Sequence, residues 1–79
     1  MEKNEILVRV KEVVSSVIKV ENSEITDDAN FIFDLGADSM QSVELVAGFE
    51  EAFDIEMDQD KALDIQNIDD AVNFIAEYL

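Results

Sequence analysis

Residues 4–19 show the apolar spacing of an amphipathic helix. Apolar side chains recur every three or four positions, and charged side chains stand between them. The segment is rich in β-branched residues, but the two-residue alternation of a half-buried strand is absent. The pattern therefore predicts a helix whose core face consists of Ile6, Leu7, Val10, Val13, Val14, Val17 and Ile18.

Residues 20–38 have no such period and contain several Asn and Asp residues and a glycine, Gly36, which is typical of a loop. Loops longer than about 12 to 15 residues are uncommon in compact domains and are usually functional. We expect this loop to be held against the core by its own apolar side chains, namely Ile25, Phe31, Ile32 and Leu35.

A second helix is predicted over residues 39–53. Asp38 stands in the N-cap position with Gln41 three residues later, which is the spacing of a capping box. At about 100° per residue, one stripe of this helix faces the core. That stripe consists of Leu45, Val46, Phe49, Ala52 and Phe53.

The opposite side of this helix carries apolar residues ringed by acids. This face consists of Met40, Val43, Ala47, Glu44, Glu50 and Glu51. Such a surface is typical of a docking site for a partner protein. Single exposed apolar residues are also common on ordinary surfaces, so the pattern alone leaves both interpretations open.

The rest of the chain predicts a short helix over 58–63, a turn over 64–67 and a last helix that begins near Asn67. Asp69 and Asp70 fall in its first turn, where negative charge suits the helix dipole. Its core face consists of Ile68, Ala71, Val72, Ile75, Ala76 and Leu79. A chain of 79 residues forms one core, so we expect a single all-α domain over 1–79 with three longer helices, one short helix and a long loop.

The net charge of −15 is spread unevenly along the chain. Residues 1–19 hold four bases and three acids, whereas residues 20–79 hold seventeen acids and one base, Lys61. Such a surface repels nucleic acid and anionic lipid, and it attracts basic partners over a Debye length of about 8 Å. We therefore expect no nucleic-acid binding, no membrane insertion and, because of self-repulsion, a monomer.

The residue types that are missing exclude most catalytic chemistry. The chain has no His and no Cys, so it lacks the commonest general base, the strongest nucleophile and any native thiol. We expect no enzymatic activity. Residues 54–60 place acids at alternate positions as a calcium loop does, but Gln59 stands where Gly is needed and Ile65 where a bidentate Glu is needed. No specific metal site is predicted.

The N-terminal residues contain no basic stretch leading into an apolar run, and no segment approaches about 20 apolar residues. We therefore expect a cytoplasmic protein.

Ser39 is the remaining distinctive residue. A serine near a helix start is usually a cap, but here it lies in the string 35–40, Leu-Gly-Ala-Asp-Ser-Met. With the following Val43-Glu44-Leu45, this string resembles the signature of the acyl carrier protein family, in which a Gly-x-Asp-Ser-Leu stretch opens the second helix. The resemblance extends through residues 25–31 and 71–75 to almost the whole chain, and the flanking motif residues are Gly36, Asp38 and Met40.

The resemblance implies a four-helix bundle of the discrete, type II kind. It implies that a holo-carrier-protein synthase, which is a phosphopantetheinyl transferase, attaches 4'-phosphopantetheine to Ser39. The arm would supply the missing thiol and carry acyl groups as thioesters to fatty acid biosynthesis enzymes with basic docking patches. It also implies an acyl cavity between the helices, although the same side chains could simply pack as core; the candidates are Leu45, Val46, Phe49, Ile65 and Ile75.

Two alternatives remain open at this point. The same arm could serve a specialised pathway, with a polyketide, a specialised lipid or D-alanine as its cargo. In a different class, the chain could be an unmodified acidic module that binds partners or cations.

The chain departs from the family pattern at several positions. Met40 stands where Leu is most frequent, Gln41 and Phe33 where acids are frequent, Lys61 in a usually acidic short helix, and Asp58 where Pro is common. These changes weaken any metal site near the signature and alter the partner surface. An exposed Phe33 would be a candidate contact for one particular partner.

Overall fold

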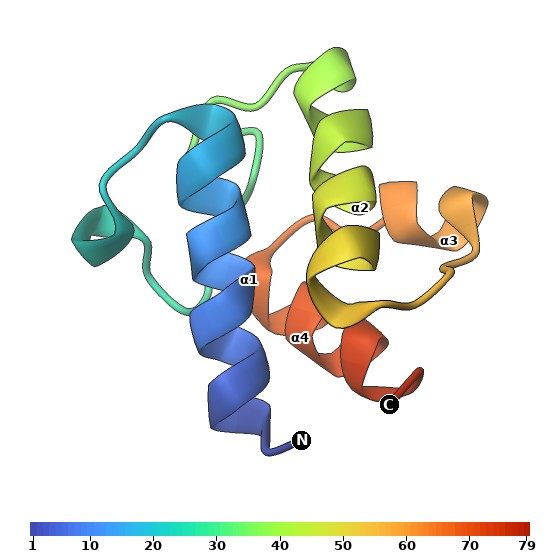
Figure 1. The fold of residues 1–79 in the computed structure, drawn as a ribbon. Helices are drawn as coiled ribbons and strands as arrows, with labels where there is room; N and C mark the ends of the chain where they lie inside the picture. The colour runs from blue at the N-terminus through green and yellow to red at the C-terminus, as the bar shows by residue number, and fades with distance from the viewer.

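The computed structural model describes residues 1–79 and consists of helices joined by loops (Figure 1). Each of the four predicted helices is present, and its first residue lies within one position of the expected one. A short 3-10 turn within the long loop is an addition that the sequence pattern did not predict. In chain order the elements are α1 (Lys3–Ile18), η1 (Asn22–Glu24), α2 (Ser39–Phe53), α3 (Gln59–Leu63) and α4 (Ile68–Ala76).

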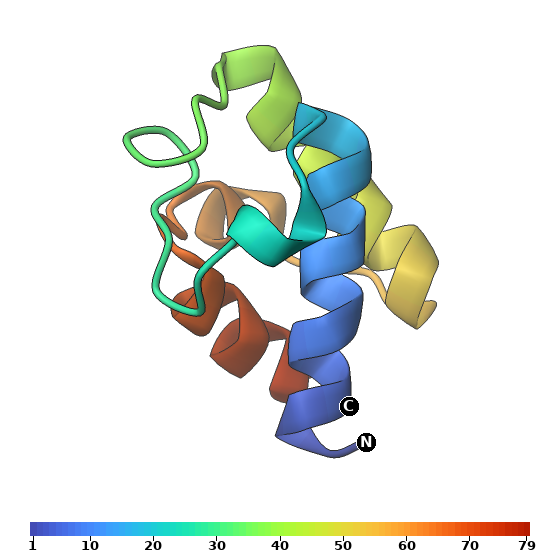
Figure 2. The same cartoon turned by 90° about the vertical axis from the view of Figure 1, so that its left-hand side faces the viewer.

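Helix α1 is the centre of the packing, since it contacts both α2 and α4, while the short α3 lies against α2 (Figures 1 and 2). The core is entirely apolar, with no buried polar or charged side chain. The largest fully buried side chains all come from α1 and α4, and they are Ile6, Val10, Val14, Ile68 and Ile75. The α1 residues repeat every four positions, as the sequence pattern predicts.

The predicted core faces are confirmed except at one residue, Leu79. Every other predicted residue is either fully buried or half-buried against the core, and the half-buried ones are Leu7, Val13, Val17, Ile18, Ala52 and Ala76. Leu79 was expected on the core face of the last helix, but it is exposed. The reason is that α4 ends at Ala76, so the helical spacing that would direct Leu79 inward does not continue to that residue.

The long loop is held in place by its base. The N–H of Phe31 donates to the carbonyl of Gln66 at 2.9 Å, and the N–H of Ile68 donates to the carbonyl of Ala29 at 3.0 Å, which ties the loop to the link between α3 and α4. Ile25 and Phe31 are buried as predicted. A third predicted anchor, Ile32, is 57% exposed, so that expectation is wrong.

Local hydrogen bonds explain the position of Ile32. The side-chain oxygen of Asn30 accepts hydrogen bonds from the N–H groups of Ile32 and Phe33, each at 2.9 Å. The N–H of Asp34 donates to the carbonyl of Asn30 at 3.0 Å. This Asx-type turn fixes the backbone with Ile32 and Phe33 outside the core. Leu35, after the turn, is half-buried against the core.

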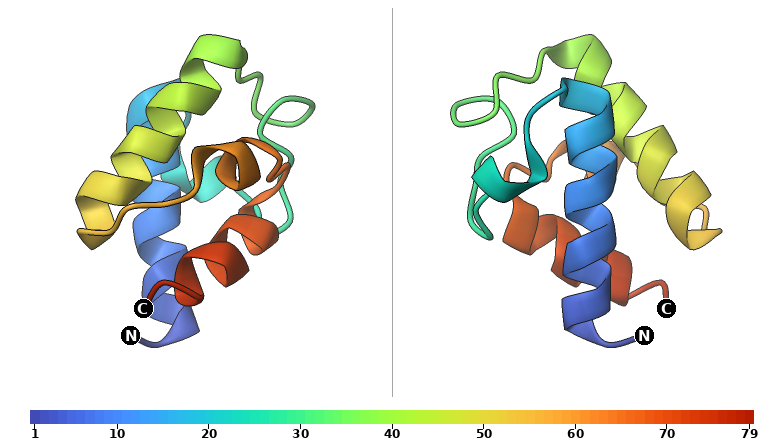
Figure 3. Two further views of the ribbon diagram at one scale, coloured as in Figure 1. Left: turned by 90° about the vertical axis from the view of Figure 1, so that its right-hand side faces the viewer. Right: turned by 60° about the vertical axis from the view of Figure 1, so that its left-hand side comes forward.

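The arrangement places the first turn of α2 far from both termini. The N- and C-terminal ends lie together at one end of the molecule, and α2 begins at the opposite end (Figures 1 and 3). The loop that leads into α2 lies beside that first turn in both views of Figure 3. The candidate site is therefore built on the end that is farthest from the chain termini.

Candidate functional site

Ser39 is the first residue of α2 and is exposed. The N-cap is Asp38, whose side-chain oxygen accepts the N–H of Gln41 at 2.8 Å, while the Gln41 side chain accepts the N–H of Asp38 at 3.2 Å. The predicted capping box is therefore confirmed. Since the cap is the neighbouring residue, the Ser39 hydroxyl is not needed to begin the helix, and none of the hydrogen bonds in the structure uses it.

The segment before Ser39 requires glycine at one position. Gly36 has φ = 76°, in the left-handed region that side chains with a Cβ adopt only at a cost of about 1–2 kcal/mol. Two hydrogen bonds close this turn, from the N–H of Gly36 to the carbonyl of Ile32 at 3.1 Å and from the N–H of Ala37 to the carbonyl of Phe31 at 2.8 Å. Buried Ala37 anchors the turn, so Ser39 is presented from a fixed base.

The surroundings of Ser39 suit a covalently attached phosphodiester. The N–H groups of Ser39 and Met40, in the first turn of α2, have no acceptor within the chain, as is normal for a helix start. They form the positive end of the helix dipole, which favours a negative group by about 0.3–1 kcal/mol when exposed. The residues present therefore fit the group that the sequence resemblance implies.

The acid-ringed face of α2 is open to solvent. Met40 is 72% exposed and Val43 is 50% exposed, and Ala47, Glu44 and Glu51 are exposed as well. This group of exposed side chains continues from the first turn of α2 along the helix, so it borders Ser39 directly.

Glu50 differs from the other two acids on this face. It is half-buried, and its carboxylate accepts the N–H of Met57 at 2.9 Å. Glu50 therefore helps to hold the link between α2 and α3. A second hydrogen bond holds the same link, since the N–H of Asp58 donates to the Tyr78 hydroxyl at 3.0 Å. The sequence pattern did not reveal this internal role, because both hydrogen bonds join residues that only the fold brings together.

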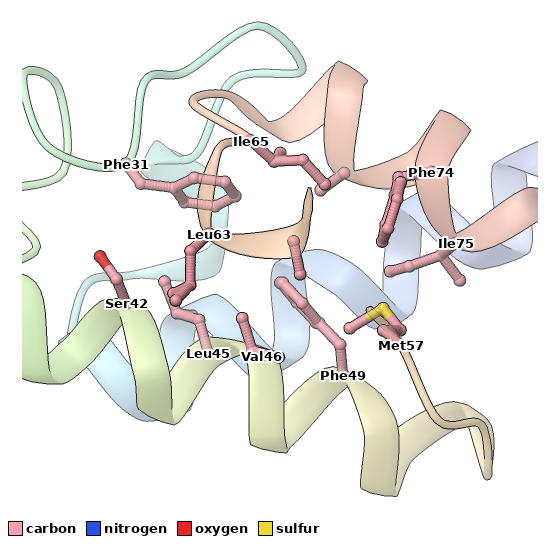
Figure 4. Close-up of a pocket in the computed structure, with 12 residues that line it drawn as sticks. Phe31, Ser42, Leu45, Val46, Phe49, Met57, Leu63, Ile65, Phe74 and Ile75 are labelled. Atoms are coloured by element: carbon pink, nitrogen blue, oxygen red, sulfur yellow. The ribbon is translucent and has the colours of Figure 1, made fainter. Parts of the chain in front are cut away.

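A narrow pocket runs between α2, α3 and α4 (Figure 4). All five cavity candidates from the sequence line it, and they are joined by residues that the pattern did not single out, among them Phe31, Met57, Leu63 and Phe74. Eleven of the twelve lining residues are hydrophobic, and the exception is Ser42 near the start of α2. The volume is about 30 Å³, which is room for only one or two water molecules.

The acidic residues do not converge on a metal site. No group of three or more His, Cys, Asp or Glu side chains lies in an arrangement that could hold an ion, and the alternating acids of residues 54–60 are no exception. No helix of the structure combines the length and the apolar character needed to cross a bilayer.

Comparison with known proteins identifies the family. The family described as "Phosphopantetheine attachment site" matches residues 8–75. The acyl carrier protein of Guillardia theta is 47% identical to this chain over 98% of it and 95% of the relative. The acyl carrier protein of Caulobacter vibrioides is 49% identical over 94% of this chain and 95% of the relative. That of Phenylobacterium zucineum is 47% identical, covering 96% of each chain.

The chain belongs to the acyl carrier protein family. The sequence resemblance and the all-α fold are thereby confirmed. The chain is a carrier without catalysis of its own, and its cofactor is 4'-phosphopantetheine, whose thiol holds the acyl group as an activated thioester. A carrier of this kind interacts with a phosphopantetheinyl transferase and with acyl-transferring enzymes.

Proposed function

We propose that Ser39 is the residue to which the arm is attached and that this carrier serves fatty acid biosynthesis in the cytoplasm. The main support for this attachment site is that the Ser39 hydroxyl is exposed at the first position of α2 and makes no hydrogen bond. The neighbouring residue Asp38 caps the helix instead. Loading would form a bond from the Ser39 oxygen to the phosphorus of coenzyme A that bears pantetheine. The bond to adenosine 3',5'-bisphosphate would break, and the hydroxyl proton would pass to the transferase.

The exposed face of α2 supports docking to basic enzymes. Met40, Val43 and Ala47 would supply apolar contact, and the carboxylates of Glu44 and Glu51 would meet Lys and Arg side chains on the partner. Glu50 belongs to the same face. One of its carboxylate oxygens accepts the Met57 N–H, and the other would be available to a basic side chain of the partner. Long-range attraction of this kind raises the association rate more than the affinity, which suits a carrier that must leave each enzyme in turn.

The pocket between the helices supports a fatty acyl cargo over the alternatives. Its lining is almost wholly hydrophobic, so an alkyl chain would give up no hydrogen bonds by entering it. The many ketone and hydroxyl oxygens along a polyketide, or the ammonium group of D-alanine, would find only Ser42 as a polar side chain there, so most of them would lack hydrogen-bond partners. Because the volume is only about 30 Å³, α2 and α3 must move apart before Leu45, Phe49 and Ile65 can surround such a chain.

The attachment site is tested by intact mass after incubation with a broad-specificity phosphopantetheinyl transferase, coenzyme A and magnesium. We expect the parent chain to gain one phosphopantetheine and the Ser39→Ala variant to gain none. Ser42→Ala is the matched control, since Ser42 lies one turn later on the same helix, and it should load like the parent. Loading of Ser39→Ala, or of neither chain in folded samples, would contradict the proposal.

The pathway is tested separately by the acyl groups on the carrier purified from its own cells. Thioesters of saturated chains of graded length, with their 3-oxo and 3-hydroxy precursors, would support fatty acid synthesis. A single branched, aromatic or aminoacyl group would instead assign the carrier to a specialised pathway and leave the attachment at Ser39 intact.

A further inference from the structure

Phe33 is the most exposed large apolar side chain of the molecule, at 87%, and its neighbour Ile32 is also exposed. Two adjacent apolar side chains in solvent are costly to maintain on a soluble surface, and such patches commonly mark interaction sites. Neither the attachment of the arm nor the docking face of α2 uses this pair. The position of this pair in the fold and the charges around it indicate which kind of partner binds it.

The exposed pair is held rigidly. Asn30 accepts hydrogen bonds from both backbone N–H groups through its side chain, and its own N–H donates to the carboxylate of Asp34 at 2.7 Å. The turn is also joined to the link before α4, because the Phe31 N–H donates to the Gln66 carbonyl. These bonds hold the backbone of Phe33 in one geometry. Because the backbone is already ordered, binding through Phe33 would cost little backbone conformational entropy, which is a property of a binding anchor.

The pair lies close to Ser39. The hydrogen bond from the Ala37 N–H to the Phe31 carbonyl, at 2.8 Å, brings the base of the turn to within two residues of Ser39, and Figure 3 shows this loop beside the start of α2. A standard interface covers about 800 Å² of each partner, so it reaches roughly 15 Å from its centre. Phe33, like Ser39, lies only two residues from an end of this hydrogen bond. A protein centred on Ser39 therefore covers Phe33.

One class of partner must be centred on Ser39. Enzymes that act on the cargo meet the far end of the arm, so they can dock anywhere along the exposed face of α2. The enzyme that attaches the arm must bring its own active site to the Ser39 hydroxyl. Resting on the proposed attachment at Ser39, we infer that Phe33 is an apolar anchor for the phosphopantetheinyl transferase that loads this carrier.

The charges around Phe33 define the complementary surface. Asp34 follows it in the chain, and Phe33 lines one groove together with Leu63 and Asp64 at the end of α3. The transferase should therefore offer an apolar pocket for the phenyl ring, with Lys or Arg side chains on its rim. The same acids disfavour a second copy of the chain as the occupant, because each copy carries a net charge of −15.

The test is the loading kinetics of the full apo chain with coenzyme A and the phosphopantetheinyl transferase encoded in the same genome. Removing an anchor at an interface commonly weakens binding by a factor of ten or more, so we expect Phe33→Ala to lower kcat/KM about tenfold, chiefly through KM. Phe33→Leu should recover most of the loss. Val8→Ala, which truncates an exposed apolar residue on α1, is the matched control and should stay within twofold of the parent.

The outcomes separate this inference from the proposed function. Loading of Phe33→Ala at the parental rate, or an equal loss in Val8→Ala, would overturn the anchor while the attachment at Ser39 stood. A concentration-dependent dimer of the parent that Phe33→Ala abolishes would assign the pair to self-association instead. Loss of protection of a loaded acyl thioester, with normal loading, would assign it to the cargo. Failure of the parent itself to load with the broad-specificity transferase would instead contradict the proposed function.

Discussion

The seam between α1 and α4 and the seam between α2 and α3 are built differently. The first contains all of the largest fully buried side chains, with Ile6, Val10 and Val14 of α1 against Ile68 and Ile75 of α4. The second borders a pocket of about 30 Å³, which α4 closes from the other side with Phe74 and Ile75, and it includes Leu63, which is exposed. A close-packed interior transmits strain rather than yielding. The comparison therefore divides the carrier into a fixed half and a half that can open for a cargo.

Truncation in the fixed seam should have the largest effect on folding. Ile68 is fully buried at the start of α4, and replacing a buried Ile by Ala costs about 2–5 kcal/mol. We expect Ile68→Ala to lower the free energy of unfolding, measured by urea denaturation, by about 3 kcal/mol, which is a large share for a domain of this size.

The matched variant in the other seam is Leu63→Ala. Leu63 is exposed at the end of α3, so its truncation should cost less than about 1 kcal/mol. Equal losses in the two variants would show that the two seams do not differ in packing.

The opening of the second seam can be measured with a cargo. Burying one methylene group is worth about 0.8 kcal/mol, and part of this is spent in parting α2 from α3. We expect an octanoyl group on the arm to raise the free energy of unfolding by about 2 kcal/mol relative to an acetyl group.

A variant that fills the pocket provides the control. Ala62 on α3 is buried and lines the pocket, and Ala62→Leu would occupy the space that the cargo needs. In this variant the octanoyl and acetyl forms should unfold at the same urea concentration. If octanoylation still stabilised the Ala62→Leu variant, the octanoyl group would have to bind outside this pocket.

The turn before Ser39 tests how strongly the site is held. In Gly36→Ala the new Cβ meets no other atom, so the only cost is the left-handed backbone, about 1–2 kcal/mol. We expect a loss of that size in urea denaturation. Gly36→Asn should lose less, because Asn tolerates this region. No difference between the two would mean that the turn relaxes to another backbone geometry.

The helices were predictable because each has a local cause. The helical spacing of apolar residues in α1 and the Asp38–Gln41 capping box of α2 both depend only on residues that are close in the sequence. The direction of Ile32 was not predictable from its apolar character, since a hydrogen-bonded turn around Asn30 decides it.

The close approach of α1 and α2 also depends on the assembled fold. A Cβ on Gly48 would lie 2.7 Å from Cγ1 of Val13, yet a glycine inside a helix carries no sequence signal of the element that crosses it. The cavity candidates were found because they share the core stripe. Their partners Phe31, Met57 and Leu63 come from a loop, a link and a helix end that only the tertiary structure brings to the same pocket.

The smallest effect is expected at the ion pair that joins α1 to the loop. Lys11 Nζ lies 2.6 Å from Asp27 Oδ1 at the surface, where such a pair contributes about 0.2–1 kcal/mol. Asp27→Asn removes the pair, but it also removes one negative charge from a chain of net charge −15, which relieves self-repulsion. Glu21→Gln, at an exposed residue with no side-chain cap bond, removes the same charge without breaking the pair.

We therefore expect Asp27→Asn to be about 0.5 kcal/mol less stable than Glu21→Gln at low salt. The difference should shrink in 1 M salt, where the Debye length falls to about 3 Å. A difference that persists in high salt would show that Asp27 holds the loop by packing and hydrogen bonding rather than by its charge.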